Sequence, residues 1–126
     1  MTKRTITITI DHLPPADLNP NRLSHNIHWT KRSLVERRAR EEGYYLALEQ
    51  WKQAKPMQKV RVSILFTFKD NRDHDLDNIL SAAKPYLDGF KDAGLIVGDS
   101  YKHLSYGRIE GENTGKEQTI IKIQEV

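Results

Sequence analysis

Hydrophobic and polar residues alternate strictly in two stretches of the chain. In residues 5–10, TITITI, the three isoleucines face one way and the three threonines the other, which predicts a half-buried strand. Residues 60–68 repeat the pattern with a larger apolar face, formed by Val60, Val62, Ile64, Phe66 and Phe68. Leu65 is apolar on the opposite face, so we expect this second strand to be central in its sheet.

A helix is predicted between these two strands. Ser33 and Glu36 have the spacing of a capping box, which predicts a helix that begins at Ser33 and runs to about Ala54. Gly43 should weaken this helix by about 1 kcal/mol and is a point where it could divide. The residues expected to face inward are Leu34, Val35, Tyr45, Leu48 and Trp51.

A second helix is predicted over roughly Asp75 to Asp92. Its apolar stripe has helical spacing and comprises Leu76, Ile79, Leu80, Ala83, Tyr86, Leu87 and Phe90. Pro85 lacks a backbone N–H and presses on the preceding turn, so we expect a kink or a split there. Asp88 and Asp92 fall on the opposite side and are expected to face solvent.

Three further strands are predicted at Leu95–Val97, Tyr101–Ile109 and Gln118–Val126. The last two are separated by a turn rich in glycine and asparagine, which predicts a terminal hairpin. The expected fold is therefore a single α+β domain over residues 1–126, with a mixed sheet, two main helices and the order β-α-β-α-β-β-β.

Composition excludes several classes of protein. The chain has 126 residues and no cysteine, so neither a disulfide framework nor a zinc-thiolate site is available. No apolar run approaches the ~20 residues that cross a bilayer, and the first ten residues lack the apolar core of a signal peptide. We expect a cytoplasmic protein without membrane contact.

The net charge of +3 conceals an asymmetry between the two halves of the chain. Residues 1–61 hold 12 Lys/Arg and 6 Asp/Glu, a balance of +6, whereas residues 62–126 hold 8 and 11, a balance of −3. The cations of the first half crowd around the start of the first predicted helix: Lys31, Arg32, Arg37, Arg38 and Arg40. They form either a solvated helix face or a contact surface for phosphates, and Trp29 beside them is either a core residue or a platform for a base.

The second half gathers carboxylates at the start of its helix. Asp73, Asp75 and Asp77 are followed by Asn78, and Asp99 comes after an apolar run. Such a cluster either holds a hard cation such as Mg²⁺, or one aspartate caps the helix while its neighbours favour the positive helix end. A calcium loop of the EF-hand type is excluded, because its sixth position would be Asn78 instead of glycine and its twelfth Lys84 instead of glutamate.

The sequence Asp75-Leu76-Asp77-Asn78 at a helix start, followed by Ala93-Gly94-Leu95-Ile96-Val97-Gly98-Asp99, resembles the RusA family of Holliday-junction resolvases, many of them encoded by phages and prophages. The resemblance implies an endonuclease that resolves four-way DNA junctions by paired nicks, in recombination and repair. It implies a homodimer and a Mg²⁺ ion, with Mn²⁺ as a substitute. Asp75, Asp77 and Asp99 would be the metal ligands.

Two departures from the family pattern affect the expected mechanism. Ser81 occupies the position where family members commonly have a lysine, so Lys84, one turn further along, is the candidate to meet the charge of the scissile phosphate. The usual acidic pair is reduced to Asp99. A binding protein with the same fold and little cleavage is therefore an alternative, as is an unrelated basic DNA-binding domain whose acidic cluster is only a helix cap.

Overall fold

The computed structural model describes residues 3–18, 29–52 and 55–126. Its strands form one sheet in the order β1-β4-β2-β3, in which β2 and β3 are parallel and the other neighbours antiparallel. The elements in chain order are β1 (Thr5–Ile10), the short 3₁₀ helix η1 (Ala16–Leu18), α2 (Trp29–Gln50), β2 (Val60–Phe68), α3 (Leu76–Asp92), β3 (Leu104–Asn113) and β4 (Gln118–Glu125). The predicted class, a single α+β domain with a mixed sheet and two main helices, is confirmed.

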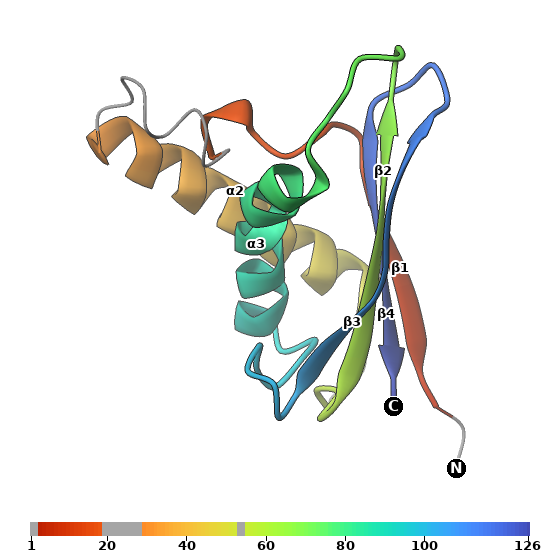
Figure 1. Cartoon of the computed structure of the whole chain (residues 1–126). Coiled ribbons are helices and arrows are strands. Elements are labelled where there is room, and N and C mark those ends of the chain that lie inside the picture. The colour runs from red at the N-terminus through yellow and green to blue at the C-terminus, as the bar shows by residue number, and fades with distance from the viewer. Residues whose placement is uncertain (1–2, 19–28, 53–54) are drawn as a thin grey trace.

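Both helices cover the same face of the sheet (Figure 1). The apolar positions of the predicted strands point to that face, and Ile8, Val62, Ile64, Phe66 and Ile121 are almost fully buried there. β2 lies between β4 and β3, so its predicted central place is confirmed. Among the described residues no helix is long and apolar enough to span a membrane.

The predicted terminal hairpin is wrong. β3 and β4 are joined by a short turn, but β2 lies between them and pairs with both. The backbone N–H groups of Thr114 and Gly115 donate to the carbonyl of Phe68, so the turn passes over the end of β2. α3 connects β2 to β3 as the crossover that a parallel pair requires.

The predicted short strand at Leu95–Val97 is not a strand of the sheet. Ile96 forms a single parallel bridge with Met57, and Leu95 and Ile96 are buried. The described part of the chain therefore contributes four strands to the sheet, one fewer than the sequence pattern indicates.

The predicted boundaries and inward face of the first helix need correction. α2 begins at Trp29, four residues before the expected capping box at Ser33, and ends at Gln50 instead of about Ala54. Of the residues predicted to face inward, Val35 and Trp51 do pack against the core, whereas Leu34, Tyr45 and Leu48 are exposed, Tyr45 by 66% and Leu48 by 43%. Ala39 and Ala47 are buried instead. The helix presents its small residues to the core because a second helix crosses it there.

α2 and α3 cross where two glycines face each other. A Cβ atom on Gly89 would lie 2.1 Å from the carbonyl oxygen of Arg40 and 2.6 Å from the amide nitrogen of Tyr44. A Cβ atom on Gly43 would lie 2.5 Å from the carbonyl oxygen of Tyr86. Gly43 therefore does not divide α2, as the sequence suggested, but allows the backbones of the two helices to approach.

α3 follows its predicted boundaries closely. It runs without interruption through Pro85, so the split considered there does not occur, and Pro85 itself is buried. The apolar stripe packs inward as predicted, with Tyr86, Leu87 and Phe90 at or below 1% exposure. The helix ends before Gly94, whose φ of 82° needs a residue without a side chain.

Candidate functional site

The acidic motif lies at the start of α3. Asp75 is the N-cap, and its carboxylate accepts hydrogen bonds from the backbone N–H groups of Asp77 at 2.9 Å and Asn78 at 3.3 Å. The helix-capping interpretation is thus confirmed for one oxygen of Asp75. Asp77 is exposed in the first turn, where the positive end of the helix dipole favours a negative charge.

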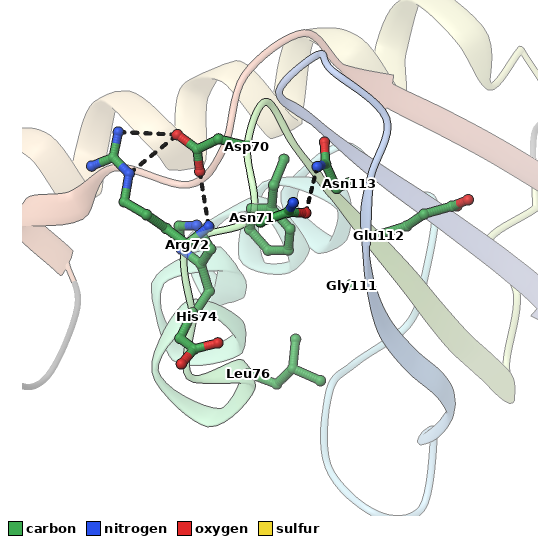
Figure 2. Close-up of a pocket in the computed structure, with 10 residues that line it drawn as sticks. Asp70, Asn71, Arg72, His74, Leu76, Gly111, Glu112 and Asn113 are labelled. Atoms are coloured by element: carbon green, nitrogen blue, oxygen red, sulfur yellow. Dashed lines mark hydrogen bonds and ion pairs between the residues drawn. The ribbon is translucent and has the colours of Figure 1, made fainter.

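The loop that leads into this motif is fixed by side-chain contacts (Figure 2). Arg72 donates to the Asp70 carboxylate through both its backbone N–H and its guanidinium group, and the Asn113 amide of β3 donates to Asn71 at 2.7 Å. The His74 ring stacks on Phe68, with the ring centroids 4.0 Å apart. These contacts tie the approach to α3 to the ends of β2 and β3.

Asp99 reaches α3 at a different place. The Lys84 ammonium donates to Oδ2 of Asp99 at 3.2 Å. This hydrogen bond holds the pKa of Asp99 below its ordinary value. Partial burial lowers the pKa of Lys84, but the hydrogen bond and charge of Asp99 outweigh it, so the Lys84 pKa lies above its ordinary value. The pair is therefore ionised at neutral pH.

Two residues that sequence reasoning did not select belong to the surroundings of this pair. Asp88 was expected to face solvent, but it is half-buried, and burial raises its pKa against the opposing effect of Lys84. Burial likewise raises the pKa of Tyr106 on β3, which is influenced by Lys84, Asp99 and Asp88. Asp88 is one helical turn from Lys84 and was predictable from spacing, whereas Tyr106 required the register of β3.

The structure does not bring Asp75, Asp77 and Asp99 together. Within the described ranges there is no group of three or more histidine, aspartate or glutamate side chains that could hold a metal ion. The expected convergence therefore fails for two physical reasons. Asp75 turns its carboxylate toward its own helix, and Asp99 is neutralised by Lys84, seven residues and about 10 Å of helix beyond Asp77. The three carboxylates therefore do not form one metal site in this arrangement, although Asp75 and Asp77 lie together at the start of α3.

The cations of α2 differ in whether they already have a partner within the protein. Arg40 forms a two-bond ion pair with Asp92 of α3, at 2.5 and 2.8 Å, and Lys31 lies 3.8 Å from Asp17. In the described part of the chain, the guanidinium groups of Arg32, Arg37 and Arg38 have neither an ion pair nor a hydrogen bond. The side chain of Trp29, the predicted base platform, lies outside the described residues.

Two cavities adjoin these residues. One of about 190 Å³ is lined by Arg32 of α2 and by Ser81 and Lys84 of α3, among others, with Glu36 and Asp88 at its wall. The other, of about 590 Å³, lies beside Asp75 and Asn78 and extends to the Pro14–Pro15 segment. The basic helix and the acidic helix therefore share a concave surface, although they are separate in sequence.

Comparison with known proteins adds no family assignment. No family model matches the chain, and no curated protein matches it either. The resemblance to junction resolvases therefore depends on the motif residues themselves.

Proposed function

We propose that this chain is a metal-dependent, structure-specific endodeoxyribonuclease of the RusA type that nicks four-way DNA junctions and acts as a homodimer. The observation that carries the proposal is the shared cavity between the two helices. It places Arg32, from the basic half of the chain, beside Lys84, whose partner Asp99 comes from the acidic half. A candidate phosphate-binding cation, Arg32, and one of the residues proposed for cleavage, Lys84, thus line one cavity.

The surroundings of Lys84 support a role close to a phosphodiester. Lys84 is 57% exposed, so it can reach a ligand without unfolding the helix. Its ion pair with Asp99 fixes the ammonium group, which is then preorganised to meet charge that develops on a phosphate. Ser81, which occupies the family's lysine position, lines the same cavity, one turn from Lys84.

The proposed metal ion is Mg²⁺, at the start of α3. Mg²⁺ is usually bound by one or two carboxylates together with substrate phosphates, and it would activate a water and stabilise the leaving oxygen. Asp77, exposed at the helix start, and Asp75 are the available ligands there, with Mn²⁺ as the alternative ion. We propose that Asp99 becomes a third metal ligand only if its ion pair with Lys84 breaks.

Asp75 allows the two interpretations of the motif to be separated by one substitution. Asparagine caps helices about as well as aspartate, so Asp75→Asn should leave the free energy of unfolding nearly unchanged. If the carboxylate also serves in cleavage, the same variant should lose the paired nicks that the parent makes in a labelled four-way junction with Mg²⁺. Glu49→Gln, the same charge change at an exposed position of α2, is the matched control.

The outcomes divide cleanly. The nuclease is supported if the parent and the control make nicks that depend on Mg²⁺ and Asp75→Asn makes none. If the parent leaves the junction intact in both Mg²⁺ and Mn²⁺, the nuclease proposal is wrong.

A second function is favoured by the separation of the carboxylates. With Asp75 engaged as a cap and Asp99 paired with Lys84, a protein of this fold could bind branched DNA without cutting it. Tight binding of a four-way junction over linear duplex, without nicks in either metal, would establish that function.

A further inference from the structure

At one end of the sheet β2 begins beside the end of β4 (Figure 1), and a second group of cations lies there. A cavity of about 490 Å³ at this end is lined by Lys3, Arg4, Lys55 and Lys59, with Gln58, Glu125 and Val126. We call the three lysines the lysine cluster. Lys3 lies more than fifty residues before Lys55 and Lys59, so the primary sequence does not show the three lysines as a group.

Backbone and side-chain contacts hold this cavity in one arrangement. Arg4 donates to both carboxylate oxygens of Glu125, with the shortest contact at 2.6 Å, and also to the backbone carbonyl of Lys55 at 2.7 Å. Its guanidinium carbon lies 5.3 Å from the centre of the Trp51 ring. The backbone N–H of Val126 donates to the carbonyl of Lys59 at 2.9 Å. The segments that carry the lysines are therefore fixed before any ligand arrives.

The charge of the cavity is strongly positive. Glu125 is its one acidic side chain among the lining residues, and Arg4 already neutralises it. In the part of the chain that the structure describes, none of the three lysine ammonium groups forms an ion pair or hydrogen bond. Three lysine charges around a concave surface raise the local concentration of anions.

The lysine cluster also lies near the segment that carries Asp99. His103 bonds through Nδ1 to the carbonyl of Gln58 at 2.9 Å, and its ring approaches Gly98, the residue before Asp99. We infer that the lysine cluster binds phosphates of the DNA backbone next to the Lys84–Asp99 pair. This inference rests on the proposed function and extends it, because it assigns phosphate contacts outside α2.

The test counts phosphate contacts through salt dependence. Each lost contact reduces the slope of log affinity against log salt by about 0.9 for duplex DNA, so Lys55→Ala/Lys59→Ala should flatten the slope by about 1.8. When NaCl rises from 50 to 200 mM, the fold-loss of affinity should then be about ten times smaller for the double variant than for the parent. Fluorescence anisotropy with a labelled four-way junction, without metal, measures both slopes.

The matched control is Lys69→Ala/Lys116→Ala, which removes two exposed lysines at the opposite end of the sheet, where β2 ends. Its slope should equal that of the parent. If Lys55→Ala/Lys59→Ala has the same slope as the parent, the inference is wrong and the proposed function is unaffected. The same conclusion follows if both double variants flatten the slope equally. A parent that does not bind the junction at all would overturn both. Thermal melting of each variant confirms that the fold is retained.

Discussion

Substituting Gly89 with alanine should separate the two helices. The added Cβ would lie 2.1 and 2.6 Å from backbone atoms of α2, and backbone cannot move aside as the tip of a flexible side chain can. Overpacking of this kind costs about 1–3 kcal/mol, and a separation of 0.5–1 Å also forfeits a quarter to a half of the dispersion energy of each affected contact. Alanine returns about 1 kcal/mol through its better helix propensity. We expect a net loss of about 2 kcal/mol in the free energy of unfolding.

Urea unfolding and thermal melting measure this loss. For a chain of this length, 2 kcal/mol corresponds to roughly 8 °C in the melting temperature. Ser33→Ala is the control because Ser33 is exposed in the interior of α2, where a change within about 0.5 kcal/mol is expected. If α2 instead began at Ser33, that variant would lose about 1 kcal/mol of capping energy. A Gly89→Ala protein that melts within 1 °C of the parent would refute the described crossing.

Four further predictions concern charge and assembly. The hydrogen bonds from Arg4 hold the pKa of Glu125 at about 2, below its ordinary 4.5, so this pair stabilises the fold above pH 4.5 and the contribution disappears as the pH falls to about 2. Melting temperatures of the parent and Arg4→Gln should therefore converge over that range. Arg37→Ala/Arg38→Ala should weaken junction binding and reduce its salt slope by about 1.8, as measured by anisotropy. Lys84→Ala should slow cleavage by more than it weakens binding, and equal losses in the two assays would count against its proposed role. Sedimentation at micromolar concentration should show a dimer, and a clean monomer would contradict it.

Sequence periodicity predicted the strands and α3 because each of these elements buries a single continuous apolar face. β2 and the apolar stripe of α3 are the clearest cases. Periodicity was only partly right for α2: Val35 and Trp51 pack against the core as predicted, but the large residues Tyr45 and Leu48 are exposed. The real interface uses Gly43 and two alanines, whose small size matters only when the partner helix is known.

The hairpin error has a similar origin. The turn around Gly115 was identified correctly, and its φ of 82° explains the glycine. A turn signal reports that the chain reverses, but not that the two flanking strands pair with each other. The insertion of β2 between them is a property of the whole sheet, set by the crossover through α3.

The candidate site was predicted in part. The capping role of Asp75 and the proximity of Lys84 to the acidic segment could be anticipated from helix spacing and charge. The ion pair between Lys84 and Asp99 depends on the path of residues 93–99, and the lysine cluster depends on the meeting of two distant segments. Neither arrangement has a local sequence signal.

The order of strands in the sheet constrains how the protein can be made. β1 is synthesised first, yet its partner in the sheet is β4, with Thr5 opposite Gln124. During translation the first strand must therefore remain unpaired until β4 has left the ribosome, and β2 lacks one of its two neighbours for the same period. Contacts of such long sequence separation slow folding and leave strand edges exposed meanwhile. Deletion of residues 118–126 would deprive both strands of their partner, so a chain without this segment should be unable to complete its sheet.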